Sequence, residues 1–131
     1  MTLEPRWLPR LVVEAIHVDQ VREHGGQIGL RDENALESAL ARARQKWNYE
    51  PESDLEALAA AYAFGLSSNH PFRDGNKRVS FVAAVVFLGL NGIAFDAPQD
   101  EVVEKSLALA AGELGEADLA EWIRSRSQPL K

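Results

Sequence analysis

Apolar residues recur along most of the chain at the spacing of an α-helix, and short polar stretches interrupt the pattern. In the first such segment Leu11, Ala15 and Val18 fall on one face, three or four residues apart. Later segments show similar helical patterns. Together they predict helices over residues 9–24, 32–47, 55–67, 76–90, 100–111 and 116–124.

Residues that begin and end helices stand at the expected positions. Asp32 is a candidate N-cap for the second helix, and Ser53 with Glu56 has the form of a capping box before the third. Pro9 lies where the first turn of a helix tolerates proline. The pair Gly25-Gly26 follows the same helix, where glycine commonly ends one. These signals support an all-α fold.

The segment over residues 76–90 is apolar almost all the way round. A helix of this kind is buried, so we expect it at the centre of the fold. No repeat, low-complexity tract or linker divides the 131 residues, and their 46% hydrophobic content is enough for a core. We therefore expect residues 1–131 to form a compact single-domain bundle of about six helices around a central buried helix.

The stretch of Lys46, Trp47, Asn48 and Tyr49 leads toward Pro51, and proline disfavours helical geometry in the residue before it. We therefore expect this stretch to be extended or turning. Its aromatic side chains could equally close the core beneath a loop or line a binding site.

Composition narrows the setting of the protein. The chain contains no cysteine, which suits a reducing compartment and excludes a thiol nucleophile. Prolines and arginines break up the N-terminal residues, so no signal-type apolar stretch forms there, and the longest apolar run is too short to span a bilayer. The net charge of −6 argues against binding nucleic acid through a broad basic face. We expect a cytoplasmic protein that binds neither nucleic acid nor a membrane.

Against this acidic background, Lys77 and Arg78 stand together at the start of the helix predicted over residues 76–90. The first amide groups of a helix lack carbonyl partners and form the positive end of its dipole. Two cations there oppose the dipole and lower the stability unless an anion binds. Arginine offers a planar fork for two phosphate oxygens, while lysine acts as a point charge. The position is therefore suited to phosphate.

The residues just before these cations bring further chemistry. His70 is a candidate general base, because imidazole titrates near neutral pH. Asp74 is a candidate ligand of magnesium, which prefers one or two carboxylates together with phosphate oxygens. Gly75 permits a close backbone approach, and Asn76 can fix either the loop or a phosphate oxygen. Phe72 is most simply a buried anchor for this loop.

Two further histidines lie in the first predicted helix. His17 stands next to Ile16, and we expect it to be packed and hydrogen-bonded rather than catalytic. His24 is favoured by the helix dipole at the C-terminal end. Neither has a metal-ligand spacing with His70.

Residues 70–78, His-Pro-Phe-Arg-Asp-Gly-Asn-Lys-Arg, resemble the signature of the Fic/Doc family, His-x-Phe-x-Asp/Glu-x-Asn-Gly/Lys-Arg, with every fixed position filled. The likeness extends over nearly the whole chain. It includes Arg6-Trp7-Leu8, Ala15-Ile16-His17, His24-Gly25-Gly26, Gly29-Leu30-Arg31-Asp32 and Phe87-Leu88-Asn91-Gly92. The resemblance implies a Fic/Doc-type domain and an enzyme that moves part of a nucleotide onto a protein hydroxyl.

Two positions indicate the Doc (death-on-curing) branch, the toxin of phage and plasmid toxin–antitoxin pairs. The Fic branch typically has a glycine where this chain has Lys77 and a second arginine where it has Phe81. For a Doc-type enzyme the resemblance implies a protein kinase, with ATP presenting its γ-phosphate to the acceptor. The implied catalytic residues are His70, Asp74 and Arg78, with Asp74 holding Mg²⁺ and the phosphates bound by Gly75, Asn76, Lys77 and Arg78.

The resemblance also implies a target. It is a threonine of elongation factor Tu, whose phosphorylation arrests translation. In the family a short extended flap over the active site holds the target peptide by strand addition. The candidates for this flap are Lys46, Trp47, Asn48 and Tyr49.

No inhibitory segment of the form Ser/Thr-x-x-x-Glu-Gly/Asn occurs in the chain. Many Fic proteins carry such a segment, so any inhibitor of this chain must be another protein. The resemblance to the Doc branch implies a small antitoxin with a segment that folds on binding. Apolar residues of the late helices could form part of its groove, or simply belong to the core: Leu107, Leu114, Leu119, Trp122 and Ile123. Two alternative functions stay open, Fic-type transfer of AMP to a protein hydroxyl and a non-catalytic binding or co-repressor module.

Overall fold

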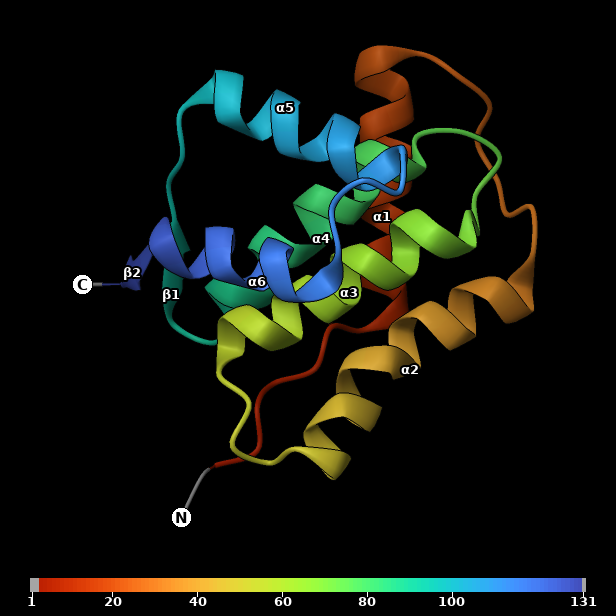
Figure 1. Cartoon of the computed structure of the whole chain (residues 1–131). Helices are drawn as coiled ribbons and strands as arrows, with labels where there is room; N and C mark the ends of the chain where they lie inside the picture. Colours follow the sequence, from red (N-terminus) through yellow and green to blue (C-terminus); the bar gives the residue numbers. More distant parts are fainter. Residues whose placement is uncertain (1–2, 131) are drawn as a thin grey trace.

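The computed structural model of the protein describes residues 3–130, which form six helices and one small sheet (Figure 1). In chain order the elements are α1 (Arg10–His24), α2 (Glu33–Tyr49), α3 (Leu55–Asn69), α4 (Asn76–Leu90), β1 (Ile93–Phe95), α5 (Gln99–Ala110), α6 (Glu116–Ser125) and β2 (Ser127–Pro129). The predicted all-α class is confirmed. All six predicted helices are present, with ends that differ by no more than two residues. None of the described helices has the length and apolar character needed to cross a membrane.

Aspartate side chains cap two of the helices. At the start of α2, Oδ1 of Asp32 accepts a hydrogen bond from the amide of Ala35 at 3.1 Å, as predicted. At the start of α3 the cap is Asp54 and not Ser53, because Oδ1 of Asp54 accepts from the amide of Ala57 at 2.9 Å. Each aspartate satisfies one amide that the helix leaves without a carbonyl partner.

Helices α3 and α4 form the centre of the fold, with α5 above them and α2 below them in Figure 1. As predicted, α4 lies at the centre and contributes to the core, with six of its 15 residues buried. Helix α3 is enclosed further, with nine of 15. Its small residues explain this, since they let neighbours approach closely. A Cβ at Gly65 would lie 3.2 Å from the carbonyl oxygen of Ala39 in α2.

The two short strands close one end of the bundle, and the sequence did not predict them. They pair antiparallel, with Phe95 opposite Ser127. The ring of Phe95 packs against Phe81 of α4 and Trp122 of α6, with centroid distances of 5.5 and 5.2 Å. Three residues are too few to show an alternating pattern, and each strand finds its partner only after the intervening helices have packed.

The prediction that residues 46–49 are extended is wrong, because they form the last turn of α2. The carbonyl of Lys46 accepts the amide of Glu50 at 2.7 Å, which closes this helix. Proline restricts only the residue directly before it, so Pro51 affects Glu50 and leaves the preceding turn free to be helical. Trp47 meets Trp7 edge-on, with ring centroids 6.0 Å apart. This contact supports the core-closing interpretation for Trp47.

Candidate active site

The signature residues 70–75 connect the end of α3 to the start of α4. His70 follows the last turn of α3 in a left-handed conformation (φ 48°, ψ 57°), and its side chain is exposed. Phe72 is only 1% exposed, which confirms it as a buried anchor. The loop therefore has a fixed apolar centre and an exposed histidine at its beginning.

Asn76 closes the loop with its side chain. Its Oδ1 accepts the amide of Phe72 at 3.0 Å, and its Nδ2 donates to the carbonyl of Phe72 at 2.9 Å. The sequence left two roles open for this carboxamide, and these contacts use it to hold the loop. The group of Asn76 that remains for an anion is its backbone amide.

The start of α4 has no side-chain cap and carries two exposed cations. Gly75 precedes it with φ 79°, a left-handed conformation that glycine adopts easily. The first amide with a helical partner is that of Val79, which donates to the carbonyl of Gly75 at 2.9 Å. The amides of residues 76–78 are therefore left without helical partners, beside the side chains of Lys77 and Arg78.

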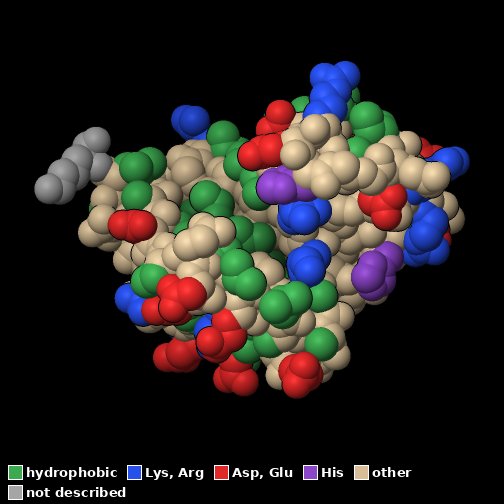
Figure 2. Space-filling model, turned by 90° about the horizontal axis from the view of Figure 1, so that it is seen from above, with side chains coloured by type: hydrophobic (Ala, Val, Ile, Leu, Met, Phe, Trp, Pro, Cys, Tyr) green, Lys and Arg blue, Asp and Glu red, His purple; other side chains and the backbone are tan. Residues whose placement is uncertain are grey.

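Neither Lys77 nor Arg78 forms an ion pair within residues 3–130. Figure 2 shows histidine and Lys or Arg side chains close together near the middle of one face, while many acidic side chains lie nearer its edge. Free amides and unpaired cations at one helix end can hold a polyanion such as a chain of phosphates.

An extended segment, residues 25–31, lies beside the signature loop. Leu30 forms an isolated antiparallel bridge with Phe72. The amide of Arg73 donates to the carbonyl of Gly29 at 3.0 Å, as in a strand pair. This segment, and not residues 46–49, is the extended chain next to His70. Residues 46–49 lie at the far end of α2, roughly 20 to 24 Å along the helix from its start.

Asp74 ties the extended segment to the loop. Its Oδ2 accepts the amide of Gln27 at 2.6 Å, and a Cβ at Gly26 would lie only 2.9 Å from the Cβ of Asp74. Gly26 therefore provides room that another residue would fill. In the sequence alone, the pair Gly25-Gly26 indicates the end of a helix and gives no sign of this close approach to Asp74.

Asp74 is also the predicted magnesium ligand. No hydrogen bond within the described chain reaches its Oδ1. No cluster of three or more His, Cys, Asp or Glu side chains capable of holding a metal occurs in residues 3–130. A single available carboxylate oxygen fits an ion that takes its other ligands from phosphate and water.

His17 supports the loop from the side of α1. It is 2% exposed, and its ring stacks on Phe72 with centroids 4.1 Å apart. Its Nε2 accepts the amide of Gly29 at 3.0 Å. Burial lowers the pKa of His17, while the nearby Asp74 raises it by a smaller amount. The prediction of a packed, hydrogen-bonded histidine is confirmed, although the sequence could not show that it contacts the signature loop.

A groove of about 430 Å³ lies between α1, α4 and α5, next to the two cations. Lys77 and Arg78 line it together with apolar side chains, among which Val103 is 48% exposed and Leu107 53%. Of the five groove candidates from the sequence, only Leu107 lies here. Leu114 packs partly buried against the core, and three others belong to the core: Leu119, Trp122 and Ile123.

Comparison with known protein families identifies the class of protein to which this fold and signature loop belong. The chain matches the Fic/DOC family over residues 7–88, which is more than half of its length, and it belongs to this family. The match includes the whole signature and the three helices before α4.

Two relatives assign the branch. The Protein kinase doc of Escherichia phage P1 is 31% identical over 111 residues, which are 84% of this chain and 86% of that protein. The Toxin Doc of Mycolicibacterium smegmatis is 36% identical over 77 residues, 58% of this chain and 59% of that protein. The Doc branch inferred from Lys77 and Phe81 is thereby confirmed.

Proposed function

We propose that this protein is a Doc-type toxin, a protein kinase that transfers the γ-phosphate of ATP to a hydroxyl of another protein. The observation that carries the proposal is the complete signature at the uncapped start of α4, where Lys77 and Arg78 are exposed and unpaired within residues 3–130. One relative is named a protein kinase and the other a toxin, and these names support the proposed kinase activity and the proposed toxin role.

In the proposed reaction His70 is the general base. Its imidazole takes the proton of the acceptor hydroxyl as the acceptor oxygen attacks the γ-phosphorus. The bond from this phosphorus to the bridging oxygen breaks, and ADP leaves with the electron pair. Transfer of this kind needs mainly positioning and stabilisation of charge.

The start of α4 supplies that stabilisation. The amides of residues 76–78, the ammonium of Lys77 and the guanidinium of Arg78 together neutralise negative charge on the transferring phosphoryl group. Lys77 also brings bulk and charge where the Fic branch has glycine. We propose that this residue turns the nucleotide so that its γ-phosphate, and not its α-phosphate, faces the acceptor.

Asp74 would hold a magnesium ion carried by the nucleotide, through the carboxylate oxygen that does not accept Gln27. Such an ion would reduce the charge of the phosphates and orient them. Asp74 has a second role that needs no metal, since its hydrogen bond keeps the segment 25–31 against the signature loop.

The target peptide would bind along the extended segment and not at the end of α2. The segment 25–31 already forms a strand-like pair with the loop, and Ile28 within it is 49% exposed. Strand addition requires an extended edge next to the reacting groups, and the bridge between Leu30 and Phe72 supports this segment as that edge. We propose residues 25–30 as the flap in place of Lys46, Trp47, Asn48 and Tyr49.

We further propose a threonine of elongation factor Tu as the acceptor, with arrest of translation as the consequence. A small antitoxin would neutralise the toxin by folding an apolar segment onto it. The groove between α1, α4 and α5 supports this part of the proposal, because it presents Val103 and Leu107 directly beside the phosphate-binding cations.

The deciding experiment uses ATP labelled separately at the α and γ positions. The protein is incubated with magnesium and purified elongation factor Tu, and in parallel with a bacterial lysate. We expect only the γ label to reach protein, with an added mass of one phosphate. Transfer of the α label would instead establish Fic-type transfer of AMP. Transfer of neither label would leave a binding or co-repressor module.

The variant His70→Ala tests whether His70 is the general base. This exposed side chain contributes little to packing, so the variant should fold as the wild type does, measured by circular dichroism. It should lose transfer by at least about 100-fold. Full activity in this variant would exclude His70 as the base.

A further inference from the structure

His70 has a backbone conformation that is uncommon for any residue other than glycine. Within residues 3–130 it is the one residue other than glycine with a positive φ. A side chain with a Cβ is strained in this left-handed conformation, and such a conformation persists only where the surroundings impose it. Pro71 adds a further restriction, because the residue before a proline prefers extended geometry. Something else must therefore hold His70 as it is.

The guanidinium of Arg31 makes the contacts that can do so. Its Nε donates to the carbonyl oxygen of His70 at 2.6 Å, and one Nη donates to the carbonyl oxygen of Asn69 at 2.9 Å. These carbonyls lie at the C-terminal end of α3, where helix carbonyls lack amide partners and the dipole is negative. A planar, charged group with two parallel donors suits this position, and it fixes both carbonyl directions at once.

Arg31 is itself held in place. Its backbone amide donates to the carbonyl of Pro71 at 2.8 Å, and so does the amide of Asp32 at 3.1 Å. Asp32 caps α2, and Nδ2 of Asn69 reaches the carbonyl of Ala35 in the same helix at 3.0 Å. The start of α2 is thus a rigid base from which Arg31 reaches the end of α3.

We propose that Arg31 is a positioning residue, which holds the backbone of His70 left-handed and so directs its imidazole. The inference rests on the proposed function in that His70 is taken as the base. Without the guanidinium, His70 would relax toward the extended geometry that Pro71 favours, and its Cα–Cβ bond would turn. The phosphate-binding groups of α4 should stay where they are, because the hydrogen bonds of Arg31 within residues 3–130 go to Asn69, His70 and Pro71.

The test compares Arg31→Ala and Arg31→Lys with the wild type. The first readout is the ¹³Cα and ¹³Cβ chemical shifts of His70, assigned by their loss in His70→Ala, because these shifts report the backbone conformation. The second is the kinetics of γ-phosphate transfer. Arg10→Ala is the matched control, since Arg10 binds Glu33 and Glu37 in the first turns of α2 but makes no contact with the signature loop.

In Arg31→Ala we expect the His70 shifts to leave their left-handed values and kcat to fall about 10- to 100-fold, with the KM for ATP unchanged within about threefold. Arg31→Lys, which keeps the charge but not the fork, should lie between alanine and wild type in both readouts. Arg10→Ala should alter neither.

The inference is overturned if the His70 shifts are the same in Arg31→Ala as in the wild type, or if they move while kcat stays constant. Should the wild type transfer no phosphate at all, the proposed function fails separately. The chemical shifts would then still decide whether Arg31 sets the conformation of His70. If the alanine variant does not fold, Arg31→Lys carries the same comparison.

Discussion

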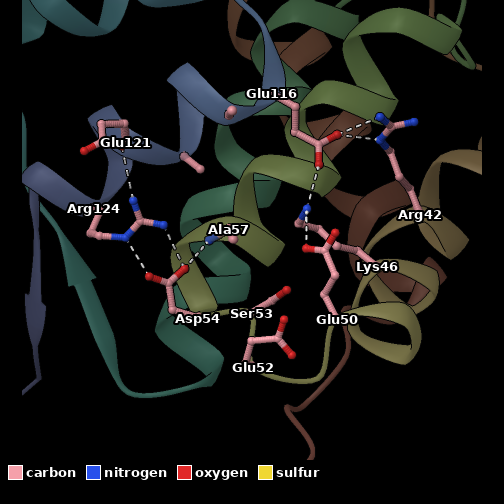
Figure 3. A pocket seen from close by; sticks show the side chains of 12 residues that line it. Arg42, Lys46, Glu50, Glu52, Ser53, Asp54, Ala57, Glu116, Glu121 and Arg124 are labelled. Carbon is pink, nitrogen blue, oxygen red and sulfur yellow. Dashed lines mark hydrogen bonds and ion pairs between the residues drawn. The ribbon is translucent and has the colours of Figure 1, made fainter.

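Two regions of the molecule gather charged side chains, and they differ in how the charges are paired. At the start of α4 the cations Lys77 and Arg78 have no acidic partner within residues 3–130. A pocket of about 630 Å³ lies between the end of α2, the start of α3 and α6 (Figure 3). Each cation in this pocket is paired: Arg42 with Glu116 at 2.7 Å, Lys46 with Glu50 at 3.4 Å and Arg124 with Asp54 at 2.6 Å.

The pairing shows which region can bind phosphate. In the pocket of Figure 3 the acidic side chains outnumber the cations, so a nucleotide would be repelled there: they are Glu50, Glu52, Asp54, Glu116 and Glu121. The ion pairs also connect α2, α3 and α6, which is a structural role. The start of α4 has the opposite character, because its cations have no acidic partner among residues 3–130 and lie beside amides without helical partners. Unpaired cations next to helix amides without carbonyl partners, and not the number of charged residues, mark the candidate site.

The largest expected effect comes from replacing one cation of each region with alanine. Arg78→Ala should lower kcat/KM for γ-phosphate transfer by about 10²- to 10³-fold, because it removes a donor to the transferring group. Its melting temperature should not fall, since Arg78 forms no ion pair in the part of the chain that the structure describes. Steady-state kinetics and thermal denaturation measure the two quantities.

Arg42→Ala is the control for this exchange and should show the reverse pattern. Its transfer activity should equal that of the wild type. The free energy of unfolding should fall by no more than about 1 kcal/mol, because the pair with Glu116 is partly exposed. If both variants behave alike, the contrast between the regions is wrong.

The next effect tests how the site is held together. Asn76→Ala should lower the free energy of unfolding by about 1–3 kcal/mol, since it leaves the amide and the carbonyl of buried Phe72 without their partner. Urea denaturation measures this loss. Asn48→Ala is a matched control, because Asn48 is exposed on α2 and should change stability by less than about 0.5 kcal/mol. Equal stability of both variants would contradict the closing role of Asn76.

A third prediction uses pH, because His17 lies behind the site whereas no histidine lines the pocket of Figure 3. Burial lowers the pKa of folded His17 below its usual 6.5. As pH falls below 6.5, the unfolded chain therefore binds a proton first, and stability decreases until the folded pKa is reached. The loss over the first pH unit should be no more than about 1 kcal/mol, which is the limit for a histidine that stays neutral in the folded state.

Denaturation curves at pH 7.5, 6.5 and 5.5 measure this dependence. His17→Phe, which keeps a ring against Phe72, should remove the contribution of His17 to it. His24→Ala should retain it, because His24 is exposed at the end of α1. A pH dependence that is identical in wild type and His17→Phe would refute the assignment.

The smallest effect belongs to the paired region. The hydrogen bond from Arg124 lowers the pKa of Asp54 below its usual 3.8. The ion pair between Arg124 and Asp54 therefore stabilises the folded state above about pH 4. This stabilisation disappears as pH falls through the lowered pKa of Asp54. Arg124→Ala should cost about 0.5–1 kcal/mol at pH 7, because the pair is half exposed, and it should lessen the loss of stability below pH 4.

Chemical denaturation at pH 7 and pH 2.5 checks this prediction. Arg22→Ala serves as the control, since Arg22 is an exposed arginine of α1 with no ion pair in the described chain. An acid dependence that stays the same after removal of Arg124 would show that the contact does not hold in solution.

Much of the fold could be predicted because helices are encoded locally. The periodicity and caps such as Asp32 gave all six helices, and residues 70–78 identified the family. The error at Lys46 to Tyr49 arose from extending the influence of Pro51 beyond the single residue it restricts. The support of the site by His17, Gly26 and Arg31 was out of reach, because those contacts join segments that only packing brings together.

The sequence by itself determined the helices, the signature loop and the chemistry that its side chains can perform. The tertiary structure decided which charges are neutralised and which remain for a ligand. Arg124 pairs with Asp54 across 70 positions, and Arg31 reaches His70 across 39. Such contacts depend on how α2, α3 and α6 pack. The strength of a polar interaction depends on the distance between its groups and on their exposure to water. The spacing of residues along the chain determines neither quantity.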